Sequence, residues 1–272
     1  MRTKALTAVG TGANEAVRRD HPSLPAVVHT EMLRLRNGFL LWYALLAPVA
    51  VAVPLYVGSA FSPEGRSGGY SQVFLGVSLE LWGVVVPMSA SLMAALSVRA
   101  DQDAWRLMFS YGVPRWRYFV GKVAALALLQ LLSTVVLAAM LAVGAWIGGT
   151  ITTDLGTVVS AAFLPWIAGL ATLAVAVYCA MRWGLGAAIS SGAAGMLFGA
   201  LISDKAIWPV IPMAWPMRVI LPLAGIGPNG VPLNPDSPLR DMGVVPVALV
   251  LSVVLTAAVL VAGGAHLQRK QI

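Results

Sequence analysis

Six long apolar runs, separated by short polar breaks, constrain the fold of this chain more than any other feature. Counted between the charged residues that flank them, which for the third run are Lys122 and Asp154, five runs contain no Asp, Glu, Lys or Arg, and the second contains a single acid, Glu80. Because an α-helix rises about 1.5 Å per residue, about 20 residues cross a hydrocarbon core ~30 Å thick. Each run is long enough, so we predict six transmembrane helices, near residues 39–58, 73–98, 120–148, 157–181, 184–203 and 243–264.

Composition favours helices over other membrane architectures. The chain is 58% hydrophobic and 11% charged, whereas soluble domains contain about 25% charged residues. A transmembrane β-barrel would show short segments of alternating hydrophobicity, but these runs are continuous and rich in Ala, Leu, Val and Gly. We therefore predict an all-α integral membrane protein. Its single cysteine, Cys179, rules out an intramolecular disulfide.

The distribution of basic residues predicts the orientation. Six spans place both termini on one side of the membrane, and 14 of the 18 lysines and arginines fall on that side. Because basic residues are retained in the cytoplasm, we predict that both termini are cytoplasmic. The net charge of +7 is then mostly a signal of topology, with some attraction to anionic lipid. No nucleic-acid partner is expected.

The segment 206–224 is apolar enough to be a seventh span, but its composition argues against that. It contains Arg218 and four prolines, and each proline lacks an amide donor and clashes with the preceding helical turn. A seventh span would also move the basic C-terminus to the outside. We predict broken or re-entrant structure on the outer face here, followed by an irregular segment over 225–242.

The N-terminal region is predicted to have two parts. Residues 1–23 show no amphipathic periodicity and are expected to be a disordered cytoplasmic extension. Residues 24–37 predict an amphipathic helix at the inner interface, which would begin a six-span domain over 24–265 with a short cytoplasmic tail, 266–272. Its apolar face is formed by Val28, Met32, Leu35 and Phe39, with Glu31, Arg34 and Arg36 placed elsewhere. A plain extension of the first span is the open alternative.

The loop between the second and third runs predicts a short amphipathic helix in the cytoplasm. Asp101 is placed to cap its first turn. Trp105, Met108 and Phe109 share one apolar face, and Gly112 and Pro114 end the helix. An ordinary basic loop with an aromatic belt remains an equal alternative.

Small residues recur every four positions in the fifth run, at Ser191, Gly195, Gly199 and Ser203. Such a stripe lets helix backbones approach closely. We interpret it as helix packing, within or between subunits.

Motifs for catalysis are missing from the sequence. Gly121–Lys122 is followed by Val123, and no glycine stands five residues before Gly121, so the phosphate-binding loop pattern is not met. No two histidines have metal-ligand spacing, and no span places a histidine or lysine base beside a serine. We therefore predict a chain that is not an enzyme and that has no metal site.

Glu80 is the one acidic residue within a predicted span. A charge in hydrocarbon is costly, so Glu80 should face a cavity, a partner or the protein interior. Its carboxylate could contact a proton or a substrate. The alternative, which we favour slightly, is a structural hydrogen bond or solvation near the headgroups.

Three features together resemble the membrane subunits of type-2 ABC exporters, and most closely the lantibiotic-immunity permeases. The first is the lead-in to span 1 with Glu31, Arg34 and Arg36. The second is the block between spans 2 and 3, with Asp101, Asp103, Gly112, Val113, Pro114, Arg115, Gly121 and Lys122. The third is the six-span layout with a long outer segment, rich in Pro and Trp, before span 6. The resemblance covers roughly residues 24–265.

The resemblance implies that residues 101–113 form a coupling helix, which sits in a groove of a separate ATPase subunit. Trp105, Met108 and Phe109 would make its apolar contacts, and Asp101, Asp103 and Arg106 its polar contacts. Gly112, Pro114 and Arg115 would form the turn that follows.

The resemblance also implies an assembly in the bacterial cytoplasmic membrane. Two permease halves, identical or related, would pair above two ABC ATPase subunits, which would bind ATP and Mg²⁺. This chain would be non-catalytic and would carry no cofactor. Members of the family export membrane-active peptides such as lantibiotics, or hydrophobic antibiotics, and so confer immunity or resistance.

Alternatives from other classes stay open. In the outer segment, Trp208 and Trp215 could contact an amphipathic substrate, or the segment could be a structural cap. A self-sufficient secondary transporter would depend on Glu80, the one acid within a predicted span. A membrane-embedded enzyme would need a nucleophile with its base, or a metal cluster.

Overall fold

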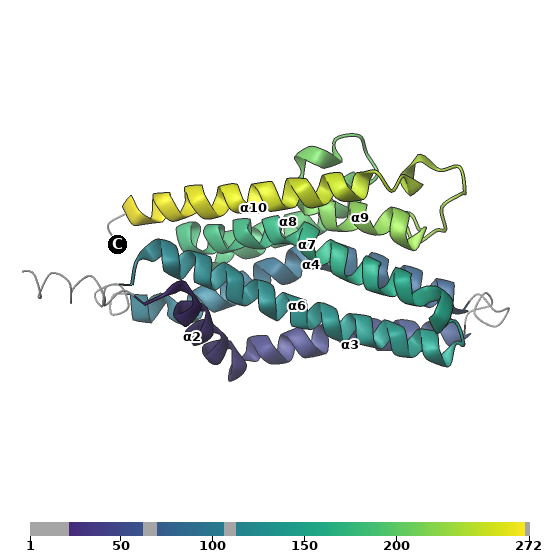
Figure 1. Cartoon of the computed structure of the whole chain (residues 1–272), viewed down its shortest axis with the longest axis horizontal. Coiled ribbons are helices and arrows are strands. Elements are labelled where there is room, and N and C mark those ends of the chain that lie inside the picture. The colour runs from purple at the N-terminus through teal and green to yellow at the C-terminus, as the bar shows by residue number, and fades with distance from the viewer. Residues whose placement is uncertain (1–21, 62–69, 106–112, 270–272) are drawn as a thin grey trace, which may run out of the picture.

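A computed structural model of the chain describes residues 22–61, 70–105 and 113–269, which form a bundle of long helices (Figure 1). Six of these helices are long and apolar enough to cross a membrane, as predicted. They are α3 (Phe39–Phe61), α4 (Tyr70–Asp101), α6 (Arg115–Ile147), α7 (Ile151–Trp183), α8 (Leu185–Ile202) and α10 (Val244–Arg269).

Helix α2 (Leu24–Arg36) and the C-terminal end of α10 lie at the same end of the bundle (Figure 1). We call this the inner end, since the basic residues assign it to the cytoplasm. The segment between α8 and α10 lies toward the opposite, outer end (Figure 1). Because the chain crosses six times, an even number, the helix before the first span and the end of the last span lie at the same end.

The spans differ in how much of their surface the protein covers. Helices α4 and α7 are the most buried, and they pack against each other and against most of the remaining spans. Helices α3, α8 and α10 expose large apolar side chains such as Trp42, Phe198 and Val261. Exposed apolar faces of this kind are what lipid tails or a second membrane subunit would cover.

Glycines on α8 account for its close contact with α4. A Cβ atom at Gly192 would collide with Ser91, and one at Gly195 would lie 3.1 Å from Pro87. A Cβ atom at Gly199 would lie only 2.5 Å from the carbonyl oxygen of Met213. The predicted packing role of the glycine stripe is confirmed, and the partners are elements of the same chain.

The outer segment is broken, as its prolines predicted. It consists of two 3₁₀ turns, Trp208–Val210 and Pro212–Ala214, followed by the ten-residue helix α9 (Trp215–Ala224). Gly225 adopts a left-handed conformation, with φ of +68°, and ends α9. Helix α9 is almost entirely buried against α4, α7 and α10 but is too short to cross a membrane, so there is no seventh span here.

Helix α2 is a separate element, which Asn37 and Gly38 divide from α3. The predicted division of its faces is wrong. Its buried residues are Val27, Glu31 and Leu35, spaced four apart, so an acid lies in the middle of the inward face. A basic side chain on α6 meets that acid and makes its burial possible.

The loop after α4 also departs from the prediction. Helix α4 continues through Asp101, which caps no helix with its side chain, and a 3₁₀ turn follows at Gln102–Ala104. Helix α6 then begins at Arg115, directly after Pro114. Residues 106–112 lie outside the described residues, and with them most of the predicted coupling helix.

Candidate functional site

Four charged side chains from three helices meet at the inner end. Glu31 and Arg34 come from α2, Asp101 is the last residue of α4, and Lys122 lies in the second turn of α6. Lys122 Nζ lies 2.6 Å from Glu31 Oε2 and also pairs with Asp101 Oδ2. Arg34 Nη2 lies 2.5 Å from Asp101 Oδ1, and Arg34 Nη1 lies 3.4 Å from Glu31 Oε1. We call these four residues the inner ion cluster.

Burial makes the members of the inner ion cluster depend on one another. Lys122 is 1% exposed, Asp101 3% and Glu31 4%, whereas the Arg34 side chain is 38% exposed. Removing a charge from water is costly unless a partner compensates for it. With two acids and two bases the cluster is neutral, so each buried charge is compensated inside it.

Neutral side chains extend the inner ion cluster toward the loop that follows α4. The Tyr118 hydroxyl donates to Asp101 Oδ2 at 2.6 Å, and Trp105 Nε1 donates to the Tyr118 oxygen at 3.4 Å. Lys122 Nζ also donates to Ser97 Oγ at 3.1 Å. A continuous chain of polar contacts therefore runs from Trp105, at the start of the loop, to α2.

The sequence contained only part of this site. Glu31, Arg34, Asp101 and Lys122 all belonged to the features that carried the resemblance, but nothing there paired them. The one sequence signal that could have indicated this site is Lys122, a base near the start of a span, which needs an acidic partner. Tyr118 lies four residues before it, on the same helix face. The pairing with Glu31 and Asp101 depends on how three helices pack.

The residues predicted to couple to an ATPase fall into three groups. Asp101 is inside the inner ion cluster, and Trp105 is half-buried against the apolar core of this chain. Asp103 is exposed. Pro114 and Arg115 are half-buried, and Arg115 Nη1 donates to the Leu267 carbonyl at 3.5 Å. The remaining residues, Arg106, Met108, Phe109 and Gly112, lie outside the described residues.

Glu80 lies toward the outer end of α4 and is half-buried. A Cβ atom at Gly230 would lie 3.0 Å from Glu80 Oε2, so the carboxylate contacts the backbone of the outer segment. Gly230 has a φ of +74°, which favours glycine on its own account. This position, against an outer loop, favours the structural alternative for Glu80.

The two tryptophans proposed as substrate contacts are both buried. Trp215 is 3% exposed, and its Nε1 donates to the carbonyls of Trp208 and Pro209, each at 3.2 Å. Trp208 is 9% exposed and packs in the same apolar core as Val219 and Ala248. Neither ring lies on the described outer surface, so their burial favours the structural-cap alternative.

Arg218 on α9 is a feature whose importance the sequence did not reveal. It is 6% exposed, and among the described residues its Nε and Nη1 have no hydrogen-bond acceptor. Its guanidinium lies 5.8 Å from the Trp208 ring. In the sequence Arg218 argues only against a seventh span, and its proline-rich context contains no signal of burial.

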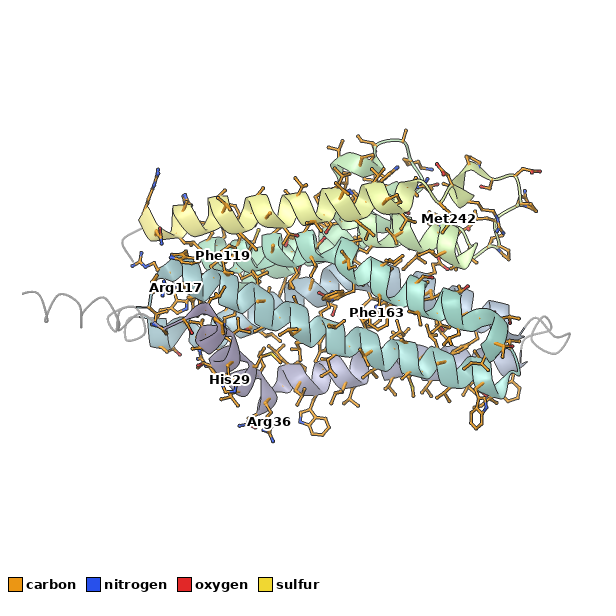
Figure 2. All side chains as sticks on the ribbon, in the orientation of Figure 1. His29, Arg36, Arg117, Phe119, Phe163 and Met242 are labelled. Carbon is orange, nitrogen blue, oxygen red and sulfur yellow. The ribbon has the colours of Figure 1, made fainter. Side chains whose placement is uncertain are left out.

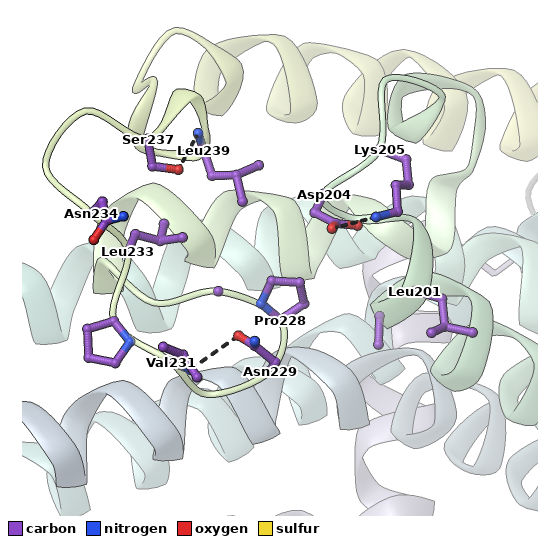
Figure 3. Close-up of a pocket in the computed structure, with 13 residues that line it drawn as sticks. Leu201, Asp204, Lys205, Pro228, Asn229, Val231, Leu233, Asn234, Ser237 and Leu239 are labelled. Atoms are coloured by element: carbon purple, nitrogen blue, oxygen red, sulfur yellow. Dashed lines mark hydrogen bonds and ion pairs between the residues drawn. The ribbon is translucent and has the colours of Figure 1, made fainter.

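Pockets open on the outer surface around the segment 225–240. One, of about 560 Å³, lies between the end of α8 and the loop 227–239, with the Asp204–Lys205 pair on one side and Pro228, Val231 and Leu233 on the other (Figure 3). A second, of about 630 Å³, lies between α4, α7 and the end of α9. Both combine apolar walls with a few charged groups, a composition suited to amphipathic molecules.

Metal chemistry finds no support in the part of the chain that the structure describes. Within it, no group of three His, Cys, Asp or Glu side chains is placed to hold a metal ion.

Comparison with known families gives one match. Residues 27–203, from α2 to the end of α8, match the family model described as ABC-2 family transporter protein. No curated protein and no solved structure matches the chain. The match includes all four residues of the inner ion cluster, while α9 and α10 lie beyond it.

Proposed function

Because the chain belongs to the ABC-2 transporter family and is a membrane permease subunit of the ABC-exporter type, we propose that the inner ion cluster transmits ATP-driven movement into the spans. The observation that supports this is the position of the inner ion cluster. It joins the helices on both sides of the loop 102–114, α4 and α6, to the interface helix α2.

The energetics of the inner ion cluster support a mechanical link. Separating α4 from α6 would break the buried pair between Lys122 and Asp101 and leave each charge with only its partner on α2, so moving one helix without the others is unfavourable. A displacement of the loop should therefore move the inner ends of α2, α4 and α6 together. Their outer ends are held by other contacts, so the movement becomes a tilt of the spans.

The loop itself is the proposed contact for a separate ABC ATPase subunit. Asp103 is exposed and available for a polar contact, and we assign Arg106, Met108 and Phe109 to the same surface. Trp105 would receive the movement and pass it to Tyr118, to which its Nε1 donates. Asp101 then acts inside this chain, as the acceptor for Tyr118 and Arg34.

The rest of the assembly follows from this role. ATP and Mg²⁺ would bind to the ATPase subunits, and this chain would be non-catalytic. A second permease half, identical or related, would complete the pathway. The proposed substrate is a membrane-active peptide, such as a lantibiotic, or a hydrophobic antibiotic. The amphipathic outer pockets support a substrate that has both apolar and polar parts.

Two experiments test the proposal. Tagged protein, purified from its native membranes in a mild detergent, should bring down a stoichiometric ATPase subunit that mass spectrometry identifies. Loss of the gene should sensitise cells to at least one member of a panel of membrane-active peptides and hydrophobic antibiotics. A preparation repeatedly free of ATPase would instead favour the secondary transporter, with Glu80 as the residue to study.

The transmission role has its own test in the assembled complex. Arg34→Gln removes the most exposed member of the inner ion cluster and should leave the complex assembled while reducing the protection of cells several-fold. Arg36→Gln is the matched control, because Arg36 is exposed on the same helix and points away from the bundle (Figure 2). Equal protection by the two variants would contradict the proposed transmission.

A further inference from the structure

A cavity of about 540 Å³ adjoins the inner ion cluster, between α2, α3 and α4. Its walls are mainly apolar, with Leu35, Leu40 and Leu96 among them, and its polar lining is the inner ion cluster together with Ser97. The volume is that of a small-molecule site. The transmission of movement proposed above does not involve this cavity.

The cavity lies where a lipid headgroup would be. It sits beside Gly38, at the break between the interface helix and the first span. Phe39 lines it and is 65% exposed, so the cavity reaches the exposed side of α3, which would face lipid. Trp42, one turn further on, is 62% exposed, as expected for an aromatic side chain near the membrane interface.

The charges around the cavity select the headgroup. Lys122 is fully occupied by Glu31, Asp101 and Ser97, so Arg34, with 38% of its side chain exposed, is the accessible donor of the inner ion cluster. A guanidinium pairs well with phosphate oxygens. Because the inner ion cluster is already neutral, a headgroup that carries an ammonium as well as a phosphate adds no net charge.

We propose that this cavity binds one zwitterionic phospholipid of the inner leaflet. Its phosphate accepts hydrogen bonds from Arg34, and an acyl chain lies along Leu35, Leu40 and Leu96. The lipid fills the space between α2 and α4 and thereby supports the inner ion cluster. This site does not depend on the proposed function, because it requires only that the chain lies in a membrane.

Native mass spectrometry of the full chain, with any subunits that co-purify, tests the site. The protein is purified in mild detergent and mixed with phosphatidylethanolamine or phosphatidylglycerol. The wild type should retain one phosphatidylethanolamine at a collision energy that strips other lipids. Leu96→Trp fills the cavity and should lower the retained fraction about tenfold. Leu197→Trp is the matched control, since Leu197 is 59% exposed on α8 and far from the cavity in sequence.

A second variant covers a failure of Leu96→Trp to fold. Arg34→Gln leaves the cavity walls intact and should lower phosphatidylethanolamine retention severalfold, while Arg36→Gln should retain it. Retention by Leu96→Trp equal to the wild type would overturn the proposal, as would a preference for phosphatidylglycerol. Equal loss of lipid in Arg34→Gln and Arg36→Gln would overturn the role of Arg34.

Discussion

Lys122 Nζ lies 2.6 Å from Glu31 Oε2, which links the third span to the interface helix that precedes the first. The two residues are 1% and 4% exposed, so little water screens the pair. With Asp101 bound to the same ammonium group, the pair holds three helices at one point. The first two predictions compare a buried charge held by ion pairs, Lys122, with a buried charge whose Nε and Nη1 lack acceptors among the described residues, Arg218.

Lys122→Met should destabilise the protein strongly. It leaves Glu31 and Asp101 buried with only the partly exposed Arg34 to compensate them, which should cost about 3–5 kcal/mol. Thermal unfolding of the detergent-solubilised protein measures this loss. Lys205→Met serves as the control, because the Lys205 side chain is 63% exposed at the outer end. Equal stability of the two variants would contradict the role given to the inner ion cluster.

Arg218→Met should have the opposite outcome. Methionine keeps much of the apolar bulk and removes a buried guanidinium whose Nε and Nη1 have no acceptor among the described residues. Asp204 and Asp241 attract the guanidinium, but burying nitrogen atoms that lack hydrogen-bond acceptors is costly, so removing them should be neutral or stabilising, by up to about 3 kcal/mol. The same unfolding assay compares it with Lys122→Met. A comparable loss of stability would show that Asp204 and Asp241 compensate Arg218 as fully as the inner ion cluster compensates Lys122.

Gly199→Ala should destabilise the contact between α8 and the outer segment. The added Cβ would lie 2.5 Å from the Met213 carbonyl oxygen, and backbone atoms cannot move aside at little cost, so we expect a loss of about 1–3 kcal/mol. Gly186→Ala on the same helix meets nothing within 4 Å and should raise stability by about 0.5–1 kcal/mol. We would measure both variants by thermal unfolding. A Gly199→Ala variant more stable than Gly186→Ala would contradict the close contact between Gly199 and Met213.

Trp105→Ala should weaken association with an ATPase subunit while the chain still folds. It removes the half-buried ring that contacts both the apolar core and Tyr118 at the start of the loop. Co-purification with quantitative mass spectrometry measures the association. Trp183→Ala, at the exposed inner end of α7, controls for the loss of an aromatic ring near the interface. Association equal to that of the wild type would contradict the assignment of the loop 102–114 as the contact for the ATPase subunit.

Glu80→Gln should leave protection of cells and protein expression within about twofold of the wild type. The amide keeps the size of the side chain and retains an oxygen that can face the Gly230 backbone. A transporter driven by protons through Glu80 would lose its activity. We would measure the expression level, and the survival of cells exposed to a compound against which the wild type protects. These two measurements separate an ABC permease from a proton-driven secondary transporter.

The parts of the fold that were predictable from sequence are those set by local properties. Each span is a long apolar run, so its existence follows from the length of helix that a bilayer requires. The broken outer segment follows from the density of its prolines, Pro209, Pro212, Pro216 and Pro222, because several missing amide donors within a few turns do not sustain one long helix. The role of the α8 glycines was also predictable, although the identity of their partners was not.

The candidate site was predictable only as a set of separate residues. Helical spacing predicts that Glu31 lies off the apolar face of its helix, and the capping preference of aspartate predicts that Asp101 caps a helix. Both expectations fail for one reason: each carboxylate meets Lys122 in the tertiary structure. The burial of Trp208, Trp215 and Arg218 likewise depends on α9 folding back between the spans.

Local sequence is enough to establish an all-α membrane protein with six spans and a broken outer segment. Hydrophobicity and proline content act over a few turns of helix, so no long-range contact is needed to read them. Which charges are buried, and which of them have a partner of opposite charge, follows instead from how the helices pack. That depends on side chains 91 residues apart in sequence, Glu31 and Lys122, meeting within hydrogen-bond distance, and packing rather than local pattern brings them together.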